Sequence, residues 1–92
     1  FIFNNSGNQK YFISSADWMT RNIDRRVEVT CPVYSKDIQK QLESIFDIQF
    51  SDNVKARIID KKMSNRFREK NDNIKGIRSQ FKIHEYFLQY EY

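Results

Sequence analysis

The stretch KYFISSADWMTRNIDRRVEVTCPV, residues 10–33, decides the fold of the amino-terminal half of this chain. It begins with the aromatic and β-branched run 10–14 and ends with the run 26–33, in which apolar and polar residues alternate. Alternation with a period of two over eight residues is typical of a β-strand. We therefore predict two strands joined by an irregular loop over residues 16–24.

The predicted strand 26–33 has two different faces. Its apolar face carries three valines and Cys31, which we expect to be buried as a small hydrophobe. Its polar face places Arg26 and Glu28 two residues apart, so that both side chains point the same way. This face either lies in solvent with a weak ion pair or lines a pocket in which the arginine binds phosphate. Pro32 ends the regular pairing or places the strand at a sheet edge.

The residues on either side add a hairpin and a helix to this pattern. The apolar residues 1–3 and the turn-forming run NNSGNQ at 4–9 predict a hairpin with residues 10–14. Further along, Ile38, Leu42, Ile45, Phe46 and Gln49 recur at helical spacing. This spacing predicts an amphipathic helix over 36–49, for which Ser35 is the expected N-cap.

The carboxy-terminal half is predicted to hold a second hairpin and a second helix. Residues 53–60 and 65–69 read as the hairpin arms, although 53–60 also fits a helix, and 70–76 reads as a polar loop. Residues 77–92 predict a final helix with one stripe formed by Ile77, Phe81, His84 and Leu88 and a second stripe beside it, formed by Ile83, Phe87 and Tyr90. The order of elements predicts an α/β (α+β) fold, a β-sheet with two amphipathic helices.

Length and composition narrow the class of protein. The 92 residues correspond to one domain or a piece of one, and the apolar start at Phe1 suggests a strand cut in the middle of a longer protein. The net charge of +4 permits a phosphate-rich partner but is mild for a nucleic-acid-binding protein. A single cysteine excludes an internal disulfide and fits a reducing compartment. No apolar run approaches the roughly 20 residues of a membrane span.

Few residues offer catalytic chemistry on their own. The sequence has no CxxC pair and no glycine-rich phosphate loop, so metal sites and nucleotide-binding loops are unsupported. His84 is the only histidine, and we interpret it as structural or surface-exposed. The loop after residue 14 is more informative, because small hydroxyls leave room for a substrate and arginines bind phosphate. We expect Trp18 to pack this loop down rather than to cover a base.

Three stretches of the sequence are informative together: YFISSADWMTRNIDRRVEV at 11–29, PVYSKDIQKQLESIFDIQFSDNVKARIIDKKMSNRF at 32–67 and IRSQFKIHEYF at 77–87. They resemble the bacterial polyphosphate kinases that work through a phosphohistidine. The resemblance covers essentially the whole chain. It implies that residues 1–92 are the carboxy-terminal part of the last phospholipase D-like catalytic domain of such an enzyme.

The resemblance also implies roles for particular residues. Ser14 to Asp17 fall on the G-S-x-N step of the phospholipase D superfamily, and Arg26 to Glu28 fall on its N-x-E strand. Asp17 and Arg26 depart from the asparagines of that pattern, so Asp17 is expected to hold the loop by accepting backbone N–H bonds.

The active-site histidine itself is expected a few residues before Phe1, outside this chain. The resemblance implies that Glu28 orients the ring of that histidine and that Ser15 contacts the histidine or the phosphate. Arg21 and Arg26 are implied to bind phosphate and stabilise charge on the transferring phosphoryl group.

The implied activity is reversible transfer of the ATP γ-phosphate to inorganic polyphosphate. Mg²⁺ is the implied cofactor, with ligands outside this chain, and the isolated chain is expected to be inactive. The implied partners are ATP or ADP, polyphosphate, other domains of the same chain and a second copy of the protein, without nucleic acid. The expected location is the bacterial cytoplasm or the periphery of the inner membrane. The alternatives are a phospholipase D-type phosphodiesterase or nuclease half-domain, and a non-catalytic binding or scaffold domain.

Overall fold

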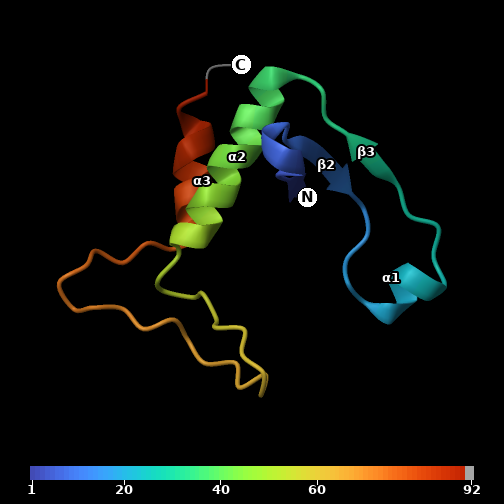
Figure 1. Cartoon of the computed structure of the whole chain (residues 1–92). Coiled ribbons are helices and arrows are strands. Elements are labelled where there is room, and N and C mark those ends of the chain that lie inside the picture. Colours follow the sequence, from blue (N-terminus) through green and yellow to red (C-terminus); the bar gives the residue numbers. More distant parts are fainter. Residues whose placement is uncertain (91–92) are drawn as a thin grey trace. The chain divides into compact units, whose positions relative to one another are not determined.

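Figure 1 shows the computed structural model of the chain, which describes residues 1–90. The chain divides into two compact units, Phe1–Gln41 and Leu42–Tyr92, and the boundary falls inside helix α2 (Lys36–Ser51). A three-stranded antiparallel sheet together with helices confirms the predicted α+β class.

The first unit is built around the sheet, in the order β1-β2-β3. Strands β1 (Ile2–Phe3) and β2 (Lys10–Ser14) form the predicted hairpin. The short 3₁₀ turn η1 (Asn5–Gly7) joins them, and Gly7 has a φ of 89°, a value that glycine adopts without steric cost. Strand β3 (Thr30–Pro32) pairs with β2 on its other side.

Both faces of this sheet carry apolar side chains. On one face the ring of Phe3 lies 5.8 Å from that of Phe12. On the other face lie Tyr11 and Ile13, since successive side chains of a strand point to opposite sides. Tyr11, 6% exposed, is the only buried hydrophobic side chain among residues 1–90. Apolar side chains on both faces are typical of a sheet that is covered on both sides.

The predicted strand 26–33 is much shorter than expected. Its pairing with β2 begins only at Thr30, and Val27 is 100% exposed. The physical reason is that alternation predicts a strand but supplies no partner, and β2 has turned away beyond Ser15. Cys31 is exposed, so the prediction of a buried thiol is wrong. It lies on β3, an edge strand of the sheet whose three residues are all exposed.

The loop predicted for residues 16–24 also differs, because it contains the one-turn helix α1 (Thr20–Asp24). The prediction that Pro32 lies at a strand end and a sheet edge is confirmed.

The long helix α2 agrees with the sequence pattern and runs two residues further than predicted. The carbonyl of Ser35 accepts the first helical hydrogen bond, from the N–H of Gln39, at 2.9 Å, which is the position expected of an N-cap residue. Leu42 and Ile45 of the predicted stripe are half-buried, whereas Ile38 and Phe46 remain exposed.

The final helix α3 (Ser79–Leu88) is shorter than the predicted 77–92, of which residues 91 and 92 lie outside the described residues. Of the two predicted stripes, the first is largely exposed on the helix, at Phe81, His84 and Leu88. The second is half-buried at Ile83 and Phe87. The helical period alone does not distinguish two adjacent apolar stripes.

The segment between the two helices leaves the end of α2 and returns to the start of α3 (Figure 1). It forms neither the predicted strands nor the alternative helix over 53–60. The hairpin is reduced to one antiparallel bridge, between Arg57 and Phe67. Among residues 1–90, no helix has the length and apolar character needed to cross a bilayer.

Candidate functional site

The first group of interest lies where β2 ends, around Ser15. Its N–H donates to the carbonyl of Val29 at 3.0 Å, and its Oγ accepts the N–H of Val29 at 3.1 Å. The same hydroxyl donates to a carboxylate oxygen of Glu28 at 2.5 Å. Two residues that lie 13 positions apart in the sequence are therefore brought into direct contact, as the resemblance implied for a shared site.

The neighbouring serine reinforces this junction. Ser14 Oγ and Thr30 Oγ1 share a hydrogen bond of 2.9 Å across the strand pair, and Ser14 Oγ also accepts the N–H of Ala16 at 3.2 Å. Because each bond joins the end of β2 to a following segment, the pair of serines fixes where the loop 16–29 starts and where it returns.

Asp17 organises the first half of that loop. Its Oδ1 accepts the N–H of Met19 at 2.8 Å and a hydrogen bond from the side-chain amide of Asn22. An aspartate that accepts a backbone N–H two residues later forms an Asx turn, which starts a helix or turn. The expectation that Asp17 holds the loop through backbone N–H bonds is confirmed, and its acceptor oxygen is occupied within the chain.

Asn22 links Asp17 to Arg26 and was not singled out in the sequence. It is 6% exposed, and its Oδ1 accepts a hydrogen bond from Nη1 of Arg26 at 3.4 Å. The series Asp17–Asn22–Arg26 therefore ties the turn before α1 to the segment after it. An amide side chain four residues before an arginine is a sequence signal for such a contact. This signal is weak, because the spacing occurs commonly in sequences.

The two arginines expected to bind phosphate are both exposed. Arg26 is held by Asn22, whereas the guanidinium of Arg21, on α1, makes no hydrogen bond or ion pair to any other residue within 1–90. Arg26 and Glu28 lie in the irregular segment before β3 rather than on a strand face. The prediction that they lie on a strand is therefore wrong.

Trp18 does not pack the loop down as predicted. Its side chain is 84% exposed, and its ring meets the edge of Phe1 with the centroids 6.5 Å apart. Together with Phe3, Phe12 and Thr30, these two rings line an apolar hollow of about 400 Å³ on one face of the sheet. Nothing in the first unit fills it.

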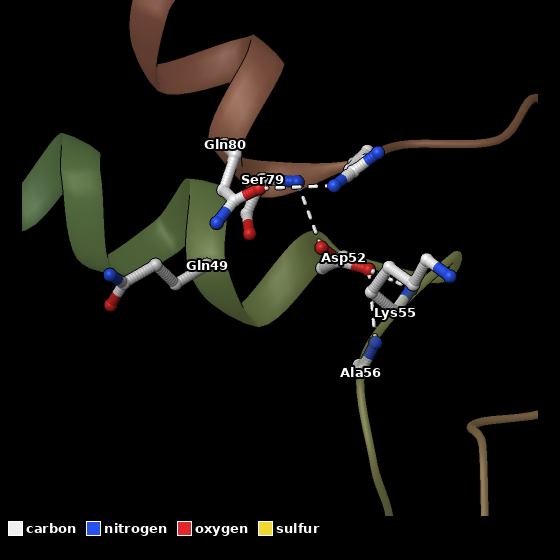
Figure 2. Close-up of a pocket in the computed structure, with 7 residues that line it drawn as sticks. Gln49, Asp52, Lys55, Ala56, Ser79 and Gln80 are labelled. Carbon is white, nitrogen blue, oxygen red and sulfur yellow. Dashed lines mark hydrogen bonds between the residues drawn. The ribbon is translucent and has the colours of Figure 1, made fainter.

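The second unit contains a buried carboxylate that the sequence analysis missed. Asp52, 5% exposed, directly follows α2. Its Oδ1 accepts backbone N–H bonds from Val54, Lys55 and Ala56 at 2.9, 2.7 and 3.1 Å, and its Oδ2 accepts the N–H of Ser79 at 2.8 Å. Figure 2 shows the carboxylate between the two segments, at the edge of a hollow of about 310 Å³.

These contacts change the acidity of the group. The backbone N–H of Ser79, followed by that of Lys55, holds the pKa of Asp52 well below its usual value of 3.8, because hydrogen bonds to the charged form favour it. Asn53 continues the junction, since its N–H donates to the carbonyl of Ile77 at 3.0 Å and its Oδ1 accepts the N–H of Ile77 at 2.7 Å. With every oxygen of Asp52 occupied by the backbone, we interpret this carboxylate as structural.

The residues present do not form a metal site. Within residues 1–90, no three His, Cys, Asp or Glu side chains are grouped so that they could hold an ion. His84 is exposed on α3 and belongs to no such group.

Comparison with known proteins agrees with this arrangement. Residues 1–80 match the family described as polyphosphate kinase C-terminal domain 2. Polyphosphate kinase of Klebsiella pneumoniae is 46% identical over 91 residues, which are 99% of this chain and 13% of that protein. Polyphosphate kinase of Vibrio vulnificus is 50% identical over 90 residues, which are 98% of this chain and 13% of that protein.

A solved structure is similar over the same extent. The crystal structure of polyphosphate kinase from Porphyromonas gingivalis matches with a TM-score of 0.82 and 39% identity, over 95% of this chain and 13% of that chain. The chain thus spans about one eighth of the length of the relatives that it matches. The resemblance found in the sequence is confirmed, and the chain belongs to the polyphosphate kinase C-terminal domain 2 family.

Proposed function

We propose that this chain supplies supporting residues to the active site of a polyphosphate kinase, which reversibly transfers the ATP γ-phosphate to polyphosphate through a phosphohistidine. The observation that carries the proposal is the contact between Ser15 and Glu28, together with the family membership. The histidine, the nucleotide-binding residues and the ligands of Mg²⁺ belong to other parts of such an enzyme. The isolated chain has no kinase activity, because it lacks the nucleophile.

In this proposal Glu28 accepts a hydrogen bond from the ring N–H of the catalytic histidine. A carboxylate in this position fixes the tautomer and orientation of the ring and stabilises its charged form. Ser15 donates one hydrogen bond to Glu28, which limits the rotation of the carboxylate and leaves its other oxygen for the histidine. Ser15 is therefore a positioning residue in the first instance.

The two arginines supply positive charge to the phosphoryl group during transfer. A guanidinium is always charged and binds phosphate oxygens in a planar fork, and fixed positive charge stabilises the transition state of phosphoryl transfer. Arg21 is unengaged by its own unit, and Arg26 is steadied through Asn22. Asp17 is not assigned a phosphate contact, since its oxygen serves Met19 and Asn22.

The apolar faces of the sheet support a role within a larger protein. A sheet with apolar side chains on both faces needs cover on both sides, yet Phe3 on one face and Ile13 on the other are each more than half exposed. Other domains of the same enzyme would provide that cover.

The test uses a chimera, in which this chain replaces the matching segment of a full-length polyphosphate kinase. Glu28→Gln and Arg26→Ala, each in the chimera, are expected to lower polyphosphate synthesis at least tenfold while leaving the melting temperature unchanged. Glu43→Gln and Lys36→Gln, which make similar charge changes on the exposed surface of α2, serve as matched controls. Unchanged synthesis in both site variants would contradict the proposal and favour the scaffold alternative.

A further inference from the structure

The positive charge of the chain is concentrated in one segment, residues 53–70, which we call the basic loop. It contains seven lysine and arginine residues against two carboxylates, so its formal charge of +5 exceeds the +4 of the whole chain. The remaining residues are close to neutral. The net charge of the whole chain is therefore mild, although the second unit contains a strongly basic segment.

The basic loop is held in shape rather than left as an open excursion. The bridge between Arg57 and Phe67 consists of two hydrogen bonds, in which the N–H of Ile58 donates to the carbonyl of Arg66 at 2.9 Å and the N–H of Arg68 donates to the carbonyl of Ala56 at 2.8 Å. These two bonds join the two sides of the basic loop at one point. In addition, the guanidinium of Arg68 donates to the carbonyl of Phe50 at 2.9 Å, at the end of α2.

The turn between the two sides of the basic loop is organised by Asp60. Its Oδ1 accepts the N–H groups of Lys62 and Ser64, both at 3.0 Å, and its Oδ2 accepts the hydroxyl of Ser64 at 2.5 Å. The Ser64 hydroxyl lowers the pKa of this carboxyl, as do the backbone bonds. Since these bonds occupy the carboxylate, Lys61 and Lys62 project from a fixed turn without an acidic partner.

The cations of the loop divide into two groups. Arg57 and Arg68 are used internally: Arg57 lies 3.2 Å from the centroid of the Phe67 ring and donates to the carbonyl of Asn65 at 2.8 Å. Arg66 reaches only 4.0 Å from Asp60. In contrast, four exposed lysines form no ion pair with any carboxylate within the described residues; they are Lys55, Lys61, Lys62 and Lys70.

We propose that the basic loop binds the inorganic polyphosphate chain, through residues other than those assigned to phosphoryl transfer. The inference rests on the proposed function, in that it takes polyphosphate as the substrate. Polyphosphate carries a charge on every unit and has no bases, so flexible lysines that act as compact point charges suit it better than a rigid fork. A surface of this kind binds by neutralising phosphates and releasing counterions.

A single-stranded nucleic acid is the less favoured occupant. Proteins that bind such strands stack the bases on open aromatic rings. Phe67 is the only aromatic residue of the basic loop, and it lies beneath two cations, Arg57 and Lys55, whose Nζ is 5.7 Å from the ring centroid. The loop therefore offers charge without a stacking platform.

The test measures binding of fluorescently labelled polyphosphate to the full 92-residue chain, with folding checked by circular dichroism. We expect affinity to fall about 50-fold between about 50 and 200 mM salt, as for roughly four neutralised phosphates. Lys61→Gln combined with Lys62→Gln should weaken binding roughly 30-fold and roughly halve the salt dependence. Lys36→Gln combined with Lys40→Gln removes the same charge from α2 and should have little effect.

Equal binding by the loop variant and the unmodified chain would overturn the proposal. Equally effective competition by single-stranded DNA with the same number of phosphates would overturn the assignment to polyphosphate in favour of nucleic acid. The assay does not depend on turnover. Failure of the proposed function would instead be seen in the synthesis rate of the chimera.

Discussion

The carboxylate of Asp52 leads to a prediction that tests the contributions of its two oxygens separately. Replacing Asp52 by Asn keeps the size of the side chain but leaves only one acceptor oxygen. That oxygen will stay with the three N–H donors of residues 54–56, which converge on Oδ1. The new NH₂ group then faces the N–H of Ser79, donor against donor, where Oδ2 now accepts.

The size of the effect follows from the number and kind of bonds lost. Loss of a hydrogen bond to a charged acceptor raises an opening equilibrium by roughly 10- to 100-fold. We expect amide hydrogen exchange at Ser79 to accelerate by about that factor. Exchange at Lys55 should accelerate less, by roughly threefold to tenfold, because its bond weakens from charge-assisted to neutral but survives. Asp47→Asn, on the exposed surface of α2, is the control.

The pH dependence provides an independent check. Because folding lowers the pKa of Asp52, its stabilising contribution is complete above the ordinary value of 3.8 and is lost as the pH falls toward the lower folded value. Protection of the Ser79 amide from hydrogen exchange should therefore decline in acid in the unmodified chain. In the Asp52→Asn variant, the part of this decline that comes from protonation of Asp52 should be absent. Equal acceleration at Ser79 and Lys55, or none at either, would refute the reasoning.

Three further predictions concern the first unit. Tyr11→Ala should destabilise the sheet by about 3–5 kcal/mol, because Tyr11 is the only buried hydrophobic side chain within residues 1–90. Thermal melts measure this loss, and the control Tyr11→Phe should cost only about 1 kcal/mol. Asn22→Ala should speed proteolysis of the loop 16–29 by removing the link between Asp17 and Arg26, and an unchanged cleavage rate would contradict that link. Ser15→Ala should lower polyphosphate synthesis by the chimera by roughly tenfold in kcat with little change in KM for ATP, and Ser15→Thr should restore part of it.

The local pattern predicted those elements whose hydrogen bonds are local. The hairpin of β1 and β2 and the start of α2 follow from the sequence because turn residues, β-branched runs and helical spacing act over a few positions. The strand over 26–33 was overestimated, because a strand needs a partner, and only residues 30–32 have one. The sequence left open which of the two stripes of α3 is covered for a related reason: the covered side depends on what packs against the helix.

The candidate site also contains some residues that the sequence indicated and others that it did not. The resemblance pointed to Ser15 and Glu28, and the structure joins them, although their catalytic roles stay predictions. Asn22 and Asp52 were missed because their importance comes from burial and from partners up to 27 positions away. No spacing rule signals a carboxylate that accepts N–H bonds from two distant segments.

The position of Pro32 has a consequence for self-association of the chain. The N–H of Val33 donates to the carbonyl of Tyr11, and the N–H of Ser15 donates to the carbonyl of Val29. Because antiparallel pairs alternate in their hydrogen bonding, residues 30 and 32 direct their backbone groups away from β2, toward the open edge. Proline has no N–H, so it costs the sheet no bond there and removes a donor that another strand would use. The chain thus limits edge-to-edge pairing, and with it fibre growth, at the point where its sheet is open.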